Sequence, residues 1–285
     1  MPIDIQPTTK PLGAEICGVD LSQNLPDELF DEICNAFVRY KVLVFRDQKI
    51  EPAHHIAFSS RFGPLEILYA EEHRVAGYPE VAILSNEQVN GQHIGVVAAG
   101  DFWHSDISFQ RKTSLATFLY AHKLPSQGGD TEFADMQHAY DTLPGTMKER
   151  IRGLRGVHTV SKLRNSRVEV TRPGGEEYYK KQAGKKDIRH PLVRSHPVSG
   201  RKGLYLSPRF TIGIEGMDDD EAQKLLDLLF DHIIREENVY RHKWRLGNFI
   251  FWDNRSVNHR ACGGYAMDDI RLLHRTSTRG DQPFA

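Results

Sequence analysis

Two histidines and one aspartate in this sequence could bind a single metal ion. His104 and Asp106 are separated by one residue, and His259 lies far downstream. In an extended strand alternate side chains point to the same side, so His104 and Asp106 can reach one ion while Ser105 points away. Two imidazoles and one carboxylate are the ligands of mononuclear non-haem iron(II) sites, and they leave open positions on the metal where chemistry takes place.

The same donors also fit a second chemistry. Two histidines, one carboxylate and a water form a catalytic zinc site, so a zinc-dependent hydrolase stays open at this point. A His-x-Asp pair alone is weak evidence, because the chain has 14 histidines and 38 acidic residues that form such pairs by chance. Other segments of the chain must therefore decide between the two chemistries.

Two arginines near the C-terminus form the second informative pattern. In the segment 271–275 a strand would place Arg271 and Arg275 on one face, together with Leu273. If this face is turned inward, the buried guanidinium groups require anionic partners, either protein carboxylates or a carboxylate ligand. If it is turned outward, both arginines are simply solvated, and the pattern alone leaves both readings open.

Several segments together resemble the taurine and 2,4-dichlorophenoxyacetate dioxygenase family of iron(II)- and 2-oxoglutarate-dependent enzymes. In chain order they are residues 18–21, 42–48, 61–66, 102–106, 128–131, 252–255 with His259, and 271–275. The resemblance extends over nearly the whole chain. Because independent motifs occur in the order and spacing of the family, the likeness is more specific than one metal-ligand pattern.

The resemblance implies a role for six residues. His104, Asp106 and His259 would bind iron(II). Thr131 and Arg271 would hold the distal carboxylate of 2-oxoglutarate. Arg275 matches a position that can meet the anionic end of the co-substrate or of the substrate. The implied reaction uses O2, converts 2-oxoglutarate into succinate and carbon dioxide, and hydroxylates a small anionic organic substrate.

The same resemblance narrows the substrate. Taurine-specific members have a histidine and a tyrosine after the Arg-Phe-Gly motif and an asparagine before the iron motif, where this chain has Leu68, Glu71 and Gly100. Segments 62–66, 105–110 and 129–133 are closer to the aryloxyacetate branch, so we expect an aryloxyalkanoate-like acid. An alkylsulfonate or sulfate-ester dioxygenase is the alternative within the family. A zinc-dependent hydrolase and a non-catalytic metal or anion sensor are the alternatives of another class.

Hydrophobic periodicity predicts a mixed α/β chain in which strands dominate around the proposed site. Apolar residues at helical spacing predict helices over 26–40, 52–62 and 219–235. Short apolar or alternating runs predict strands over 42–45, 81–84, 115–120, 192–196, 204–207, 248–252 and 271–278. We expect residues 1–285 to form a single domain, a double-stranded β-helix (jelly-roll) core with flanking helices.

Residues 161–190 differ from the rest of the chain, because apolar residues are sparse and lysine and arginine outnumber the acids. Long insertions in compact enzymes often cover the active site, so we predict a lid here. A solvated insertion without such a role is the alternative reading.

Composition limits the cellular context. A formal net charge of −1 argues against a general nucleic-acid or membrane-surface binder. Neither a signal-peptide pattern nor an apolar run long enough to span a membrane is visible. The three cysteines, Cys17, Cys34 and Cys262, lack a disulfide-framework spacing, which favours reduced thiols and a cytoplasmic protein. The family resemblance suggests a homo-oligomer, either a dimer or a tetramer.

Overall fold

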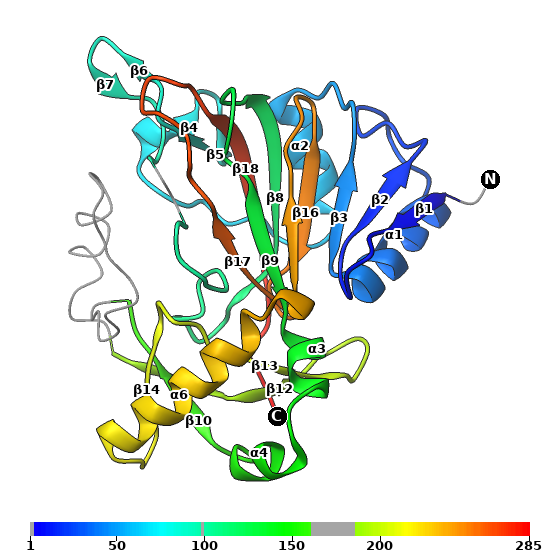
Figure 1. Ribbon diagram of the computed structural model, residues 1–285. Helices are drawn as coiled ribbons and strands as arrows, with labels where there is room; N and C mark the ends of the chain where they lie inside the picture. The colour runs from blue at the N-terminus through cyan, green and yellow to red at the C-terminus, as the bar shows by residue number, and fades with distance from the viewer. Residues whose placement is uncertain (1–2, 98–99, 161–185) are drawn as a thin grey trace.

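The largest sheet forms one wall of the molecule (Figure 1). The structure, a computed structural model, describes residues 3–97, 100–160 and 186–285. Within these residues the large sheet has eight strands in the order β1-β2-β3-β16-β8-β18-β5-β4. Adjacent strands are antiparallel except β2 and β3, which are parallel. The strands are β1 (Asp4–Pro7), β2 (Ala14–Cys17), β3 (Val42–Phe45), β4 (Arg74–Val75), β5 (Tyr78–Ser85), β8 (Ser114–Lys123), β16 (Phe249–Asp253) and β18 (Leu272–Arg279).

A smaller sheet packs against the inner face of the large one. Its order is β15-β9-β17, formed by β15 (Val239–His242), β9 (Thr131–Asp135) and β17 (Val257–Ala261). Phe133 and Val257 of this sheet share a core cluster with Leu119 and Ile250 of the large sheet. Two antiparallel sheets closed on a common apolar core form the double-stranded β-helix that the sequence predicts.

Three further groups of short strands complete the described part of the chain. The sheet β11-β10-β14 contains β10 (Arg155–His158), β11 (Ile188–Pro191) and β14 (Thr211–Ile214). The two hairpins pair β12 (Val193–Ser195) with β13 (Lys202–Leu204), and β6 (Gln88–Val89) with β7 (Gln92–His93).

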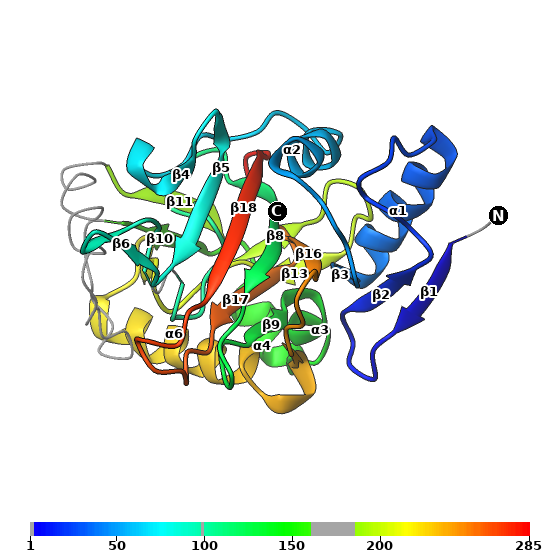
Figure 2. The ribbon, with the colours of Figure 1, turned by 90° about the horizontal axis from the view of Figure 1, so that it is seen from above.

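Strand alternation separates the two faces of the large sheet. Along β8, Phe118 packs with the outer cluster that includes Phe30 and Phe58, whereas Leu119 packs in the inner cluster. The outer cluster is covered by α1 (Asp27–Tyr40) and α2 (Pro52–Ser60). Figure 2 shows α1 beside β1 and β2, at the opposite end of the sheet from β4 and β5. Thr117 of β8 and Arg275 and Ser277 of β18 lie on the same inner side as Leu119 and Leu273 and are buried.

The remaining helices lie together below the large sheet in Figure 1. They are α3 (Met136–Asp141), α4 (Gly145–Arg150) and α6 (Asp219–Ile233), followed by the short 3-10 turn η2 (Glu236–Asn238). A second 3-10 turn, η1 (Glu71–His73), lies beside β4 and β5 of the large sheet. Asp218 caps α6 by accepting hydrogen bonds from the backbone N–H groups of Asp220 and Glu221. Leu225 and Leu229 of α6 are fully buried in a second core cluster. No helix in the described ranges is long and apolar enough to cross a membrane.

The predicted helices over 26–40, 52–62 and 219–235 are confirmed to within two residues at each end. Strands over 42–45, 81–84, 115–120, 248–252 and 271–278 are also confirmed. The strand over 204–207 is wrong, because β13 ends at Leu204 and the chain then turns. Of the predicted lid at 161–190, residues 161–185 lie outside the described residues, and 188–190 belong to β11.

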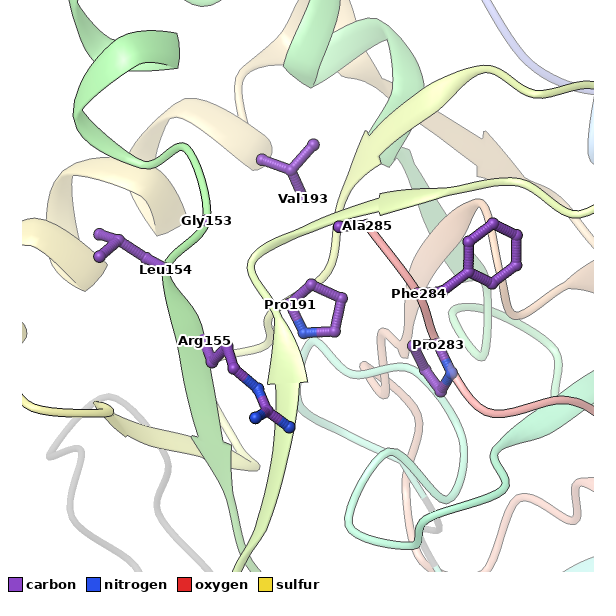
Figure 3. A pocket seen from close by; sticks show the side chains of 8 residues that line it. All are labelled: Gly153, Leu154, Arg155, Pro191, Val193, Pro283, Phe284 and Ala285. Atoms are coloured by element: carbon purple, nitrogen blue, oxygen red, sulfur yellow. The ribbon is translucent and has the colours of Figure 1, made fainter.

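A surface pocket of about 250 Å³ lies where the C-terminal residues cross β10 and β12 (Figure 3). It is lined by Gly153, Leu154, Arg155, Pro191, Val193, Pro283, Phe284 and Ala285. None of the six residues to which the family resemblance assigns a role lines this pocket. It is therefore separate from the site described below.

Several histidines are buried as neutral groups, which predicts acid sensitivity. Burial lowers the pKa of His190 to about 4 and the pKa values of His55 and His242 to about 3. Because these folded-state values lie below the unfolded value near 6.5, their contribution to stability is complete above pH ~6.5 and is lost as the pH falls toward 4. The free energy of unfolding should fall by about 1.4 kcal/mol per pH unit for each such histidine in this window.

Urea unfolding at pH 7.5, 6, 5 and 4.5 would measure this dependence. Replacing His190 by glutamine should reduce the slope of the free energy of unfolding against pH by the contribution of one histidine. A free energy of unfolding that stays constant from pH 7 to 4.5 would contradict the prediction.

Candidate metal centre

His104 and His259 are brought together by a single β-bridge. His259 lies in β17, and the backbone N–H groups of His104 and His259 each donate to the other residue's carbonyl at 3.0 and 2.8 Å. The two imidazole rings are 4.2 Å apart between centroids. A pair of residues directly opposite each other in a bridge places its side chains on the same face, so both rings point to one spot.

Asp106 completes the group. Donor atoms of His104, Asp106 and His259 all lie within 4.8 Å of one another, and this is the only such set of three or more among the residues that the structure describes. The three residues are 7, 4 and 7 % exposed. The strand expected for His104 to Asp106 is wrong: His104 makes an isolated bridge, and Asp106 begins a turn in which Ile107 has φ +55°. This turn, and not strand alternation, brings the Asp106 carboxylate close to the His104 imidazole.

Hydrogen bonds and packing fix both imidazoles. His104 Nδ1 lies 2.7 Å from the carbonyl oxygen of Phe102, which can only accept, so Nδ1 carries a hydrogen and Nε2 is the nitrogen left for a metal ion. The ring of His259 packs on Trp252 with centroids 4.5 Å apart. Burial, together with the nearby His104, lowers the pKa of His259 well below its ordinary value. His259 is therefore neutral, which is the form of histidine that binds metals.

The Asp106 carboxylate is held by two donors on one of its oxygens. Thr117 Oγ1 donates to Asp106 Oδ2 at 2.6 Å, and Arg275 Nη2 lies 3.0 Å from the same oxygen. Burial would raise the pKa of Asp106, but Arg275 and the two histidines outweigh burial and hold the pKa well below its ordinary value. The carboxylate is therefore ionised at neutral pH, as a metal ligand must be.

Arg275 is buried, 7 % exposed, and its inward orientation decides the question left open by the sequence. Besides Asp106 it donates to Ser277 Oγ from Nε at 3.2 Å and to the Tyr69 hydroxyl from Nη1 at 2.8 Å. Burial would lower the pKa of Arg275, but the Asp106 carboxylate outweighs it and raises the pKa. Three of the five N–H donors are thus used within the described protein, and two remain.

Arg271 is buried in a different way, since it has no carboxylate within ion-pair distance in the described parts of the chain. Its Nε donates to the Gly129 carbonyl at 3.1 Å, and its guanidinium lies 5.9 Å from the centre of the Trp244 ring. Burial lowers the pKa of Arg271. Trp244 also donates from Nε1 to Thr131 Oγ1 at 3.1 Å. Thr131 and Arg271 therefore flank the same tryptophan, and the threonine hydroxyl hydrogen stays free to donate to an anion.

Glycines allow the chain to pass close to these side chains. A Cβ on Gly100, which has φ +76°, would lie 2.8 Å from His104 Cε1. A Cβ on Gly129, with φ +72°, would lie 3.3 Å from Arg271 Cδ. Contacts under 3.0 Å force a neighbour to move, so Gly100 is needed for the position of His104.

Sequence reasoning missed three residues of this site. Tyr69, which adopts φ +66°, binds Arg275. Thr117 binds the carboxylate, and Asn254 binds both Thr117 and the backbone of Asp106. Thr117 lies inside a predicted strand and Asn254 lies inside a motif of the family resemblance, but the sequence assigned no role to either residue. Only strand register and the turn at Asp106 bring them together.

The donor set fits a single divalent metal ion. Two imidazole nitrogens and one carboxylate converge in a buried site, which is the ligand set of mononuclear non-haem iron(II) oxygenases. Arg271 adds a buried cation, and an anionic ligand would offset the cost of burying its charge. Fold and site together define a metal-dependent enzyme that takes an anionic small molecule.

Comparison with known proteins identifies the family. Residues 4–277 match the family described as taurine catabolism dioxygenase TauD, TfdA family. The chain is 35 % identical to the alpha-ketoglutarate-dependent 2,4-dichlorophenoxyacetate dioxygenase of Cupriavidus pinatubonensis, over 94 % of this chain and 95 % of that one. It is 31 % identical to the (S)-phenoxypropionate/alpha-ketoglutarate-dioxygenase of Sphingobium herbicidovorans, over 98 and 95 %. The chain therefore belongs to the TauD, TfdA family.

Two further relatives are informative. An alpha-ketoglutarate-dependent sulfate ester dioxygenase of Pseudomonas putida is 31 % identical over 99 % of this chain and 91 % of its own. The crystal structure of AAD-2 in complex with Mn(II) and N-oxalylglycine superposes with a TM-score of 0.81 at 32 % identity, covering 100 % of both chains. The fold is thus that of the family over its full length.

Replacing Gly100 by alanine should weaken metal binding. The added Cβ would displace the His104 ring, and the left-handed backbone would add about 1–2 kcal/mol of strain. We expect the affinity for Co(II) or Mn(II), measured by calorimetry, to fall about tenfold or more.

Gly77 is the matched control, because it has φ +79° but no atom within 4 Å of an added Cβ. Gly77→Ala should carry similar backbone strain and leave metal affinity unchanged. Equal metal affinity in both variants would show that Gly100 does not position His104.

Proposed function

We propose that the chain is an iron(II)- and 2-oxoglutarate-dependent dioxygenase that hydroxylates a small organic acid of the aryloxyalkanoate class and releases succinate and carbon dioxide. The observation that carries the proposal is the buried group His104, Asp106 and His259 with Arg275 on its carboxylate, together with a second buried arginine, Arg271, at the start of the same segment. A zinc-dependent hydrolase would use the same three ligands but would leave Arg271 without an anionic partner. A non-catalytic metal or anion sensor is disfavoured, because loss of one metal ligand would be the simplest route to inactivity and all three ligands are present.

His104, Asp106 and His259 would hold iron(II), which supplies the activation of O2 when bound. The protein keeps each of these ligands in its metal-binding form. The Phe102 carbonyl holds the proton of His104 on Nδ1, and Arg275 with Thr117 keeps Asp106 ionised.

Arg271 and Thr131 would bind the distal carboxylate of 2-oxoglutarate. A buried guanidinium with no protein carboxylate costs several kcal/mol, and a carboxylate ligand removes that cost. Thr131 adds one hydroxyl donor, since its oxygen already accepts from Trp244. An Arg-carboxylate pair gives a charge-assisted contact with defined orientation, which fixes the co-substrate relative to the metal ligands.

Arg275 would orient the anionic end of the substrate. Two of its five N–H donors have no partner among the described residues, and a third is held by the Tyr69 hydroxyl. For an aryloxyalkanoate, hydroxylation at the carbon beside the carboxylate gives a hemiacetal that collapses to a phenol and an oxo acid, which is glyoxylate for an aryloxyacetate. Relatives that act on 2,4-dichlorophenoxyacetate and (S)-phenoxypropionate support this class.

A sulfate ester or alkylsulfonate is the second candidate substrate. Two guanidinium N–H groups can bind sulfate oxygens as well as carboxylate oxygens, and one relative is a sulfate ester dioxygenase. Arg275 does not discriminate between these anions, so the choice depends on the experiment below.

We further propose that residues 1–285 act as one domain in the cytoplasm, as a homo-oligomer, without nucleic-acid or membrane partners. The net charge of −1 and three cysteines, none of which forms a disulfide among the described residues, support this context.

Succinate formation from 2-oxoglutarate by the iron-loaded protein under air tests the function. The panel should contain aryloxyalkanoates, alkylsulfonates, sulfate esters and simple carboxylates. We expect aryloxyalkanoates to stimulate succinate release and phenol to appear in equal amount. Asp106→Ala should abolish both. Stimulation by sulfate esters alone would favour the second candidate, and no succinate with any compound would contradict a dioxygenase for these substrates.

Replacing Arg271 by alanine should weaken 2-oxoglutarate binding by about 3 kcal/mol, because a buried charge pair is broken. Calorimetry with Mn(II)-loaded protein measures this affinity without turnover. Arg279→Ala is the control, since Arg279 lies at the other end of β18 with its side chain 60 % exposed. Normal 2-oxoglutarate affinity in the Arg271 variant would overturn its assignment.

A further inference from the structure

The two oxygens of the Asp106 carboxylate have different surroundings. Oδ2 accepts a hydrogen bond from Thr117 and an ion pair from Arg275, at 2.6 and 3.0 Å. Among the described residues Oδ1 has one ion-pair contact, with His104 Nε2 at 3.5 Å, and His259 Nε2 lies 3.7 Å from Oδ2. A carboxylate oxygen has about two lone-pair sites. The sites of Oδ2 are filled, so Oδ1 is the oxygen left to bind a metal ion.

The direction of the Thr117 hydroxyl is fixed by Asn254. Asn254 Nδ2 donates to Thr117 Oγ1 at 3.0 Å. An amide nitrogen cannot accept, so the hydroxyl oxygen receives this bond and its hydrogen must point elsewhere. The short contact to Asp106 Oδ2 takes that hydrogen, while the alternative partner Ser277 Oγ is 3.4 Å away. Asn254 therefore determines which acceptor receives the hydrogen bond of the Thr117 hydroxyl.

Asn254 also holds the backbone that carries the ligand. Its Oδ1 accepts from the backbone N–H of Asp106 and from Trp252 Nε1, both at 3.2 Å. Its carbonyl accepts from Ser105 Oγ at 2.8 Å. Trp252 in turn packs on the ring of His259. One asparagine, 1 % exposed, thus contacts the turn at Asp106 and the tryptophan that supports His259.

We propose that Asn254 and Thr117 are a positioning pair that makes Asp106 bind its metal ion through Oδ1 alone. This inference rests on the proposed metal site and extends it. With Oδ2 occupied, the carboxylate takes one position on the metal instead of two, and the remaining positions stay available for 2-oxoglutarate and O2. Neither residue touches the reacting atoms, so their role is exerted through Asp106.

Four variants separate positioning from general core stability. Thr117→Val keeps the shape and removes the hydroxyl, and Thr117→Ser restores it. Asn254→Leu removes both ends of the amide. Asn238→Leu is the control: Asn238 is fully buried and makes two side-chain hydrogen bonds, to His138 and to the His232 carbonyl, away from the site. Its loss should lower the Tm without a change at the metal.

Co(II) binding is the readout, because its visible absorption reports coordination number and geometry without turnover. We expect Thr117→Val and Asn254→Leu to bind Co(II) about tenfold or more weakly. Their Co(II) spectra should differ from wild type in the direction of higher coordination, and their 2-oxoglutarate affinity should be lower. Thr117→Ser should recover the wild-type spectrum, and Asn238→Leu should retain it.

A wild-type spectrum and affinity in Thr117→Val would overturn the positioning role while leaving the metal site intact. If Thr117→Val does not fold, the same criterion applies to Asn254→Leu against its Asn238→Leu control. Wild-type protein that binds no Co(II) would overturn both the metal site and the positioning pair.

Discussion

The structure depends on keeping one ionised carboxylate, Asp106, inside the barrel. Removing a charge from water costs several kcal/mol unless hydrogen bonds and opposite charge replace the solvent. Arg275 and Thr117 supply this replacement, and both project from the inner face of the large sheet. Register places them there: Thr117 of β8 lies directly opposite Ser277 of β18, and Ser277 accepts from Arg275. The sheet thus acts as the rigid support from which the carboxylate is held.

The two buried arginines illustrate how one strand can serve two purposes. Arg275 finds its anion within the protein, whereas Arg271, just before the same strand, has only the Gly129 carbonyl and the Trp244 ring among the described residues. A paired buried charge stabilises local structure, but an unpaired one lowers stability until an anion binds. If 2-oxoglutarate binds at Arg271 as proposed, its binding should stabilise the fold as well as prepare the reaction.

Much of this arrangement could be predicted from the sequence. The apolar period of residues 26–40 predicts α1, and the motifs around His104, Asp106 and His259 predict which side chains meet. What could not be predicted depends on three-dimensional register and local turns. Thr117 is one residue in an apolar strand until its pairing with Ser277 is known. Tyr69 reaches Arg275 from a left-handed backbone conformation, where the carbonyls of residues 68 and 69 accept from Arg74, and no pattern in the sequence indicates that conformation.

Because Arg275 contacts Asp106 and is also the proposed substrate-binding cation, the substrate and the metal ligand share one positive charge. An anion bound to the two N–H groups of Arg275 that have no partner among the described residues would draw part of that charge away from Asp106, since Coulomb interactions in a buried site are weakly screened. A less neutralised Asp106 is a stronger donor to the metal. Thr117 and Asn254 limit the consequence, because they keep Oδ2 occupied while the electrostatic balance at Arg275 changes.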